Sequence, residues 1–306
     1  MSGQAAPQLA PAPLGEARYS WGADEHLVVQ IAEAMSLAAF FRAGAISSQL
    51  AERNLDGILD ICPANASLLI RFDPDVLAPS ELEAVVRAIE ADVAQTENPS
   101  ISTRILEIPV WYDDPYTNEV GAKFRDRHQR PEGNDLEYAM AELGLDTVDE
   151  FVQRHSATPW MVSMVGFVAG LPFMFQMTDL QLQIELPKYL RPRTETPKLT
   201  VGHGGCFACI YSVKGAGGYQ MFGLTPLPIF DPAQEHGVFA ESMVLFRPGD
   251  IVKFRPVGEA EYRELAAAAE RGDDVYRIAQ VDFALDEFLA DPDGYNTRLL
   301  GALDVR

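Results

Sequence analysis

Residues 189–223 read YLRPRTETPKLTVGHGGCFACIYSVKGAGGYQMFG, and the fold is organised around them. Two glycine-rich turns, at 202–205 and 215–218, flank a short apolar strand at 209–213. Glycine lets backbone come close to a ligand or to another chain, and it tolerates a positive φ. Loops of this kind, carried on strands, often hold binding chemistry. The stretch therefore predicts either a binding site at two glycine turns or a plain sheet with tight turns.

The composition is typical of a globular protein with an acidic surface. The chain has 306 residues, of which 47% are apolar and 23% charged, and this length favours two domains. Its formal charge is -21, from 45 acidic against 24 basic residues. Because nucleic acids and anionic membranes bind basic patches, this charge argues against both as partners.

The ends of the chain and its cysteines indicate a cytoplasmic protein. Residues 1–18 are expected to form a disordered leader rich in Ala and Pro, since they lack the basic start and apolar run of a signal peptide. No apolar run is long enough to cross a bilayer. Three cysteines, an odd number, suit a reducing compartment better than a disulfide framework.

Residues 19–100 are expected to form a small α/β domain. The order of elements is β-α-β-β-α, which is typical of a split βαβ sandwich. Strands are expected at 27–31, 58–62 and 67–72, with a helix over 34–50 that breaks near Gly44 and a second helix that begins at Pro79.

Residues 101–306 are expected to form a β-barrel domain with helical insertions and a C-terminal tail, which makes the fold class α+β. A strand at 105–111 is followed by a polar helix at 120–128, a helix that Asn134 caps, and a third that Thr147 caps and that ends near His155. From Trp160 onward, short strands and regular turn signals predict a closed or nearly closed barrel.

Several motifs of the second domain resemble those of one family. Residues 166–173 read GFVAGLPF, where the family has Gly-Phe-x-Pro-Gly-Phe-x-Tyr. Further matches are DLE at 135–137, HS at 155–156, the Pro-Arg run at 187–197, GGY at 217–219, GLTP at 223–226 and PGDIVKF at 248–254. The chain is identified as similar to allophanate hydrolase subunit 1, also known as the B subunit of 5-oxoprolinase, the carboxyltransferase domain, subdomain C and D. The stretch at 111–133 places it nearest to the urea-carboxylase-like branch.

The resemblance implies both a fold and a function. The implied fold is a small α/β domain followed by a cyclophilin-like β-barrel. The implied function is that of one subunit of a biotin-dependent carboxyltransferase component, which transfers the carboxyl group from carboxybiotin to a small acceptor of the amide type. Biotin would be carried by a partner protein and ATP used by a partner subunit. The implied partners are an allophanate hydrolase subunit 2-like homologue, a biotin carboxylase and a biotin carrier protein.

Departures from the family pattern leave two other functions open. The family loop Gly-Asn-Gln-Thr-Gly-Ile-Tyr-Pro is GCFACIYS here, at 205–212, and the family arginine is Leu224. Amide groups that would pair with an amide-like substrate are thereby lost, which argues against 5-oxoproline. The alternatives are the B subunit of an ATP-dependent 5-oxoprolinase-type amidohydrolase and a non-catalytic regulatory protein of the kinase-inhibitor type.

The candidate site lies at one mouth of the barrel. The expected acid/base residues are His155 and His203, the two histidines beside the motifs, whereas His26 and His236 are expected to be unimportant. The expected substrate-binding residues are Arg191, Arg193, Gly204, Gly205, Cys206, Gly217, Gly218 and Tyr219. Some of these residues also have a structural interpretation. His155 could be a helix C-terminal histidine, the two arginines could be surface charges, and Tyr219 could pack in the barrel.

One spacing in the central stretch resembles a metal site. His203, Cys206 and Cys209 have the spacing of three zinc ligands. Positions three apart on a strand point to opposite faces, and no fourth ligand is evident. A CxxC redox pair usually opens a helix, whereas this one runs into a strand. We therefore expect no metal site and two thiols that act as small packing groups.

Overall fold

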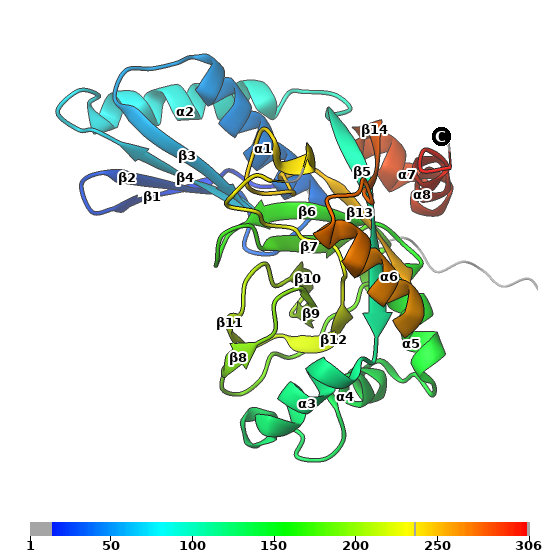
Figure 1. Cartoon of the computed structure of the whole chain (residues 1–306). Helices are drawn as coiled ribbons and strands as arrows, with labels where there is room; N and C mark the ends of the chain where they lie inside the picture. The colour runs from blue at the N-terminus through cyan, green and yellow to red at the C-terminus, as the bar shows by residue number, and fades with distance from the viewer. Residues whose placement is uncertain (1–13, 236, 305–306) are drawn as a thin grey trace, which may run out of the picture. The chain divides into compact units, whose positions relative to one another are not determined.

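The structure is a computed structural model that describes residues 14–235 and 237–304. The chain divides into two compact units, one ending at Pro99 and the other beginning at Ser100. Figure 1 shows both units and names their elements. Each unit has its own buried apolar core, so each is described by itself.

The disordered leader was predicted to extend to residue 18, but the folded unit already includes the last residues of that range. Residues 1–13 lie outside the described part of the chain, but Ala17 is buried and Arg18 already begins strand β1 (Arg18–Gly22). The backbone N–H of Ala17 donates to Oε1 of Glu90 at 3.0 Å. The folded unit begins earlier than expected because a buried carboxylate elsewhere in the unit supplies the acceptor.

The first unit contains the predicted split βαβ arrangement. Its sheet has the order β1-β2-β4-β3, and every neighbouring pair is antiparallel. Strand β4 (Ser67–Phe72) lies between β2 (His26–Gln30) and β3 (Ile58–Ala64), so β2 and β3 run parallel with helix α1 (Leu37–Glu52) connecting them. Helix α2 (Pro79–Val93) begins at the predicted proline. Strand β1, which was not predicted, adds a hairpin at the edge.

Helix α1 is continuous, so the predicted break near Gly44 is wrong. Ser36 caps the helix by accepting a hydrogen bond from the N–H of Ala39 at 3.1 Å. A glycine inside a helix costs about 1 kcal/mol relative to alanine. Burying one large apolar side chain returns about 1.5–3 kcal/mol, and α1 buries several, among them Phe41, Ile46 and Leu50.

The second unit contains the closed barrel. Around the ring the order is β12 (Gln220–Leu224), β9 (Thr200–Gly204), β10 (Phe207–Ile210), β7 (Pro172–Gln176), β6 (Trp160–Val165), β13 (Ile251–Pro256) and β5 (Ser100–Tyr112). Pairing of Gly223 with Tyr112 and of Leu224 with Trp111 closes the ring. A Cβ at Gly223 would lie 2.3 Å from the carbonyl oxygen of Trp111. Glycine is therefore required at the point of closure.

The helical insertion between β5 and β6 agrees with the predicted caps. Asn134 and Thr147 each form a capping box, at the start of α4 (Asp135–Leu143) and of α5 (Val148–Ser156). The polar helix predicted at 120–128 is displaced: α3 (Pro115–Lys123) begins earlier, because Asp114 accepts hydrogen bonds from the N–H groups of Tyr116 and Thr117 at 2.9 Å. A 3₁₀ turn, η1 (Arg125–Arg127), follows it.

The C-terminal part of the chain, for which a tail was expected, forms helices and a strand. It contains α6 (Glu259–Glu270), then β14 (Arg277–Ala284), α7 (Leu285–Ala290) and α8 (Pro292–Gly301). Strand β14 pairs with β5, and the rings of Phe283, Phe288 and Tyr295 lie within 6.0 Å of one another. None of the helices in the described ranges has the length and apolar character needed to cross a membrane.

The remaining short elements lie between the barrel strands. They are η2 (Leu180–Leu182), β8 (Arg193–Thr196), β11 (Gly215–Gly217) and η3 (Gly237–Phe239). Strands β8 and β11 pair as a separate two-stranded ribbon. This ribbon joins the proline-rich arm to the second glycine turn, which were expected to meet at the site.

Candidate functional site

The proline-rich arm (187–197) lies against both glycine segments, the hairpin at 202–205 and the turn at 215–218. These three segments were expected to meet. Leu186 and Gly205 exchange two backbone hydrogen bonds, of 3.0 and 2.7 Å. The N–H of Tyr189 donates to the carbonyl oxygen of Gly218 at 2.8 Å. The arm therefore crosses both glycine segments and holds them side by side.

The first glycine segment is mostly strand and not, as predicted, a loop over 202–205. Gly202 and Gly204 belong to β9, and the turn is only Gly205 and Cys206, between the paired residues Gly204 and Phe207. Gly205 has φ +63°, which glycine adopts without strain. A Cβ at Gly204 would lie 2.5 Å from the ring of Tyr219. The glycines thus let an aromatic ring lie against the strand.

The second glycine segment has one crowded and one open position. A Cβ at Gly217 would lie 2.4 Å from the hydroxyl oxygen of Tyr211, so this glycine packs under a tyrosine. At Gly218 the nearest atoms, all of Pro192, are 3.9 Å or more away. Gly218 is therefore the position at which something small can approach the backbone.

The outer wall of the barrel at this place is aromatic. Leu171, Cys209, Tyr211 and Tyr219 form a buried cluster, with Val168, Phe173 and Phe207 half-buried against it. The Nζ of Lys188 lies 5.1 Å from the centre of the Tyr219 ring. Nearby, Phe167 is 67% exposed. Tyr219 therefore packs in a wall whose outer edge is open to solvent.

The thiols of this wall are protonated packing groups. Burial raises the pKa of Cys209, which is fully buried, and also that of Cys206, which is half-buried in the turn. A raised pKa disfavours the thiolate that metal binding and nucleophilic attack require. Over 14–235 and 237–304, no three His, Cys, Asp or Glu side chains are placed to hold a metal ion.

The two arginines of the arm have different positions. Arg193 is 0% exposed, and its Nη1 donates to the carbonyl oxygen of Tyr219 at 2.8 Å while its guanidinium lies 4.3 Å from the centre of the Tyr189 ring. Arg191 is exposed, and its Nη2 donates to the carbonyl oxygen of Asp126 at 3.1 Å. Arg193 thus fixes the second glycine turn, and Arg191 is the one that a solvent-borne anion can reach.

The two predicted acid/base histidines lie inside the barrel and not at its mouth. Both are 0% exposed, and their ring centres are 6.3 Å apart. Alternation along β9 turns His203 inward, while Gly202 and Gly204 on either side of it face the outer wall. His155 lies in the last turn of α5 and packs among the rings of Phe254 and Trp160.

The hydrogen bonds of these histidines go to the barrel wall. Nε2 of His203 lies 3.0 Å from the carbonyl oxygens of both Ile184 and Gly205, and Nδ1 of His155 lies 2.8 Å from the hydroxyl of Tyr112. Burial lowers the pKa of His203 to about 4 and that of His155 well below its usual value. Both rings are neutral near pH 7. His26 lies in the first unit, and His236 lies outside the described residues.

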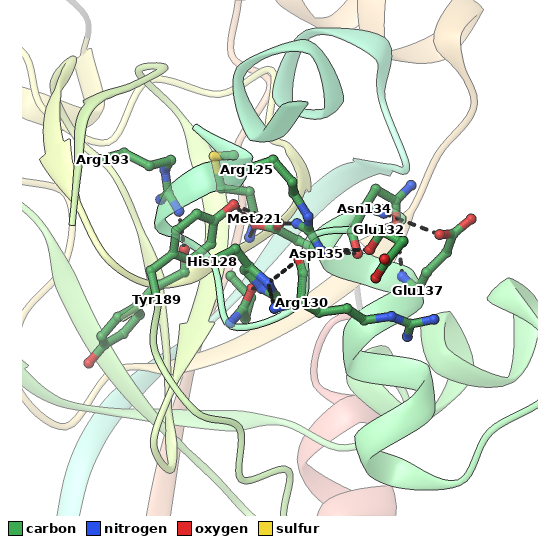
Figure 2. Close-up of polar contacts among 12 residues, drawn as sticks. Arg125, His128, Arg130, Glu132, Asn134, Asp135, Glu137, Tyr189, Arg193 and Met221 are labelled. Atoms are coloured by element: carbon green, nitrogen blue, oxygen red, sulfur yellow. Dashed lines mark hydrogen bonds and ion pairs between the residues drawn. The ribbon is translucent and has the colours of Figure 1, made fainter. Parts of the chain in front are cut away.

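A buried polar network, which the sequence did not reveal, braces the arm (Figure 2). The carboxylate of Asp135 is buried and accepts hydrogen bonds from Nη1 of Arg125 at 2.8 Å, from the hydroxyl of Tyr189 at 2.6 Å and from the N–H of Met221 at 2.9 Å. One side chain thus joins the insertion, the arm and β12. The sequence signal at this position was the DLE motif, which was interpreted as a helix start.

His128 extends this network on the other side of Tyr189. Its Nε2 donates to Oε1 of Gln220 at 2.9 Å, and its Nδ1 accepts from the N–H of Arg130 at 2.9 Å. Gln220 in turn donates to the carbonyl oxygen of Pro187 at 2.7 Å. Burial lowers the pKa of His128. This histidine is a neutral brace for the arm, and no sequence pattern indicated it because Gln220, its link to the arm, lies far along the chain.

The comparisons with known proteins identify the family. Residues 17–240 match the family model described as carboxyltransferase domain, subdomain C and D. The chain belongs to this family. The resemblance inferred from the motifs of the second domain is thereby confirmed.

The relatives within the family are enzyme subunits or parts of larger enzymes. The chain is 30% identical to the B subunit of 5-oxoprolinase from Bacillus subtilis (strain 168), over 71% of this chain and 83% of the relative. For the 5-oxoprolinase B subunit of Escherichia coli O157:H7 the identity is 28%, over 76% and 93%. For the urea amidolyase of Lachancea kluyveri it is 26%, over 83% of this chain but 14% of the relative.

Solved structures show the same fold over nearly the whole chain. The urea amidolyase of K. lactis aligns with a TM-score of 0.82 at 22% identity, covering 98% of this chain and 18% of that one. The urea carboxylase of Kluyveromyces lactis aligns with a TM-score of 0.81 at 23% identity, covering 99% and 27%. The chain therefore spans about a fifth to a quarter of these larger enzymes, and the predicted α+β fold is confirmed.

Proposed function

We propose that this chain is one subunit of a biotin-dependent carboxyltransferase component resembling urea carboxylase. In this proposal it helps to transfer the carboxyl group from carboxybiotin to a small acceptor of the amide type. The observation that carries the proposal is the likeness of fold to urea carboxylase over 99% of the chain, both units and the C-terminal helices included. The cytoplasm, expected from the odd cysteine count, is the compartment in which such a reaction would run.

The residues at the mouth fit one side of a bound biotin ring. Val168, Phe173, Phe207 and Tyr219 form an apolar wall, and the open position at Gly218 leaves the backbone accessible. The backbone groups of Gly205 are already paired with Leu186, so this wall has few free polar groups. Biotin, when bound in its carboxylated form, would supply the carboxyl group. The chain's own residues would hold the ring and exclude water, and a partner subunit would supply most polar contacts.

The residues proposed for the site have two roles. Gly204, Gly205, Cys206, Gly218 and Tyr219 line the wall, and Arg191 is placed to attract a carboxylate or bicarbonate from solvent. Gly217 and Arg193 shape the turn from within. His155 and His203 would act as positioning residues, because His203 bonds the hairpin carbonyl of Gly205 from inside the barrel and His155 packs beside His203.

The partner in this proposal is a second-subunit homologue with its own related barrel. The 5-oxoprolinase relatives are named as single subunits of enzymes that have more than one. Phe167, 67% exposed beside the aromatic wall, gives this face the apolar character of an interface. A biotin carrier and an ATP-using biotin carboxylase would complete the enzyme.

The test is reconstitution of the complete system. The chain is co-expressed with its second-subunit homologue, and biotin carboxylase and carrier are added with ATP, labelled bicarbonate and a panel of small amides. Acceptor-dependent incorporation of label that avidin blocks is the expected result. If label is never incorporated while the same complex hydrolyses 5-oxoproline with ATP, the carboxyltransferase proposal is wrong.

The second candidate is the B subunit of a 5-oxoprolinase-type amidohydrolase. It is favoured by 30% identity to a protein of that name, over 83% of that protein's length. The GCFACIYS turn, in which thiols and methyls replace amides, argues against 5-oxoproline as the substrate. Avidin separates the two candidates, because an amidohydrolase without biotin is insensitive to it.

The assembled enzyme also tests the two barrel histidines. Because they hold the hairpin, His155→Ala and His203→Ala are expected to lower turnover by about a hundredfold, as displacement of a positioning group by about 1 Å can do. His26→Ala, in the first unit, is the matched control and should leave turnover unchanged. Wild-type rates for His155→Ala and His203→Ala would leave these residues with a purely structural role.

A further inference from the structure

The barrel interior contains two ring nitrogens whose bonding is incomplete. Nε2 of His155 and Nδ1 of His203 are buried, and in the described part of the chain neither has a hydrogen-bond partner. The two rings are 6.3 Å apart, at an angle of 75°, and both contact the rings of Trp160 and Phe222. Buried polar groups nearly always have a partner in native proteins, so this pair requires an explanation.

The neighbours of each ring determine which nitrogen carries a hydrogen. Nε2 of His203 faces two carbonyl oxygens, which only accept, so the hydrogen is on Nε2 and Nδ1 is a bare acceptor. Nδ1 of His155 lies 2.8 Å from the hydroxyl of Tyr112. We assign the hydroxyl as the donor, because a phenol that only accepted would leave its own hydrogen buried and unpaired, and the ring hydrogen of His155 is then on Nε2. The unpaired atoms are therefore one donor, on His155, and one acceptor, on His203.

We propose that a single ordered water molecule bridges these two histidines inside the barrel. It accepts the Nε2–H of His155 and donates to Nδ1 of His203. The two nitrogens form no direct hydrogen bond with each other, and the ring centres are 6.3 Å apart. Buried waters typically bind to otherwise unsatisfied polar groups of this kind. A metal ion would need a third protein ligand, and the described residues place none with this pair.

The water completes a chain of hydrogen bonds through the barrel. The chain runs from the Tyr112 hydroxyl at the end of β5, through His155, the water and His203, to the carbonyl oxygens of Ile184 and Gly205. Gly205 is half of the turn at the proposed site. The water thus connects the barrel closure to the hairpin, whichever reaction the assembled enzyme performs.

The test is nuclear magnetic resonance of the full chain with ¹⁵N-labelled histidine at pH 7. We expect both rings as Nε2–H tautomers and a cross-relaxation signal between water and the His155 Nε2–H. His128 is the internal control: it has the same tautomer, but its Nε2–H donates to Gln220, so it should show no such signal. An Nδ1–H tautomer at His203, a direct nitrogen–nitrogen coupling between the rings, or no water signal at His155 would each overturn the proposal.

Two variants sharpen the test. His155→Phe removes the donor, so the Nδ1 resonance of His203 should move while the resonances of His128 stay in place. His155→Gln keeps a donor at a similar distance from the backbone and should retain the water. If His155→Phe leaves the His203 resonance unchanged, the two rings are not linked through a water. Should either variant fail to fold, the wild-type measurement decides alone.

Discussion

Burial decides the chemistry of the individual residues at this site. Desolvation inside the barrel lowers the pKa of both His155 and His203 and keeps the rings neutral. For His203 it outweighs the hydrogen bonds that would favour the charged form, and for His155 the neighbouring His203 adds to it. The guanidinium of Arg193 is covered by a carbonyl oxygen and an aromatic face. The residue types that suggest catalysis are therefore buried here, whereas Arg191 and Phe167 are exposed and the turn at Cys206 is half-buried.

The stability of the second unit should decrease in acid because of His203. Its pKa is about 4 when folded and about 6.5 when unfolded, so between these values only the unfolded chain takes up the proton. Above pH 6.5 the ring is neutral in both states, and the free energy of unfolding does not depend on this group. As the pH falls toward 4, proton uptake by the unfolded chain lowers the free energy of unfolding by up to about 3 kcal/mol. Urea unfolding at pH 7 and 4.5 measures this change in the free energy of unfolding. His203→Gln should lose less stability between these pH values than the wild type, and an equal loss would contradict the prediction.

Gly204 should not tolerate even a methyl group. In Gly204→Ala the new Cβ would lie 2.5 Å from the Tyr219 ring, which must move out of the aromatic wall. Overpacking of this kind costs about 1–3 kcal/mol. Gly215→Ala is the matched control, because no atom lies within 4 Å of its Cβ position. Thermal unfolding of the two variants should differ clearly, and equal midpoints would mean that the ring moves freely.

At the scale of elements, polar side chains decide how the helical insertion joins the barrel. Asn134 and Thr147 begin α4 and α5 by capping boxes, which are local in sequence and were predictable. Asp135, the first residue of α4, then connects that helix to Arg125, Tyr189 and the N–H of Met221. Figure 1 shows α3 and α4 at the β12 end of the unit, where this network lies.

Asp135→Asn should weaken the second unit strongly. The substitution keeps the shape but removes the charge that compensates Arg125, a buried cation, and such a loss typically costs about 3–5 kcal/mol. The control is Glu195→Gln, which removes a solvent-exposed carboxylate paired with Lys123 and Lys214 and should change little. Urea midpoints report both. Similar decreases in the urea midpoint for the two variants would show that the Asp135 network stabilises the unit no more than the Glu195 ion pairs do.

At the scale of the whole molecule, the chain has the character of one part of an assembly. Two compact units carry a charge of -21, and the fold matches a portion of much larger enzymes. An exposed phenylalanine lies beside the aromatic wall, and in the proposed assembly the partner subunit would cover this face. We expect so acidic a chain not to bind nucleic acids.

Phe167→Asn should weaken binding to the second-subunit homologue by at least about tenfold, as loss of an aromatic contact residue does. Phe167 has φ +68°, a region that asparagine tolerates, so folding should be unaffected. Leu180→Asn, which changes a side chain that is also 55% exposed, is the control and should bind as the wild type does. Calorimetry with the purified partner gives both affinities. Equal affinity for the two variants would place the interface elsewhere.

The sequence by itself determined the family, the order of elements and the helix caps, because motifs, turns and caps depend on residues within a few positions of one another. Sheet closure, the buried partners of Asp135 and the extra helices of the C-terminal part depend on contacts between residues far apart in the chain. The sequence shows glycines at 202 and 204. It does not show that these glycines face a tyrosine while His203, which lies between them, faces inward. Only the register of β9 decides this, because a shift of one residue exchanges the two faces of a strand.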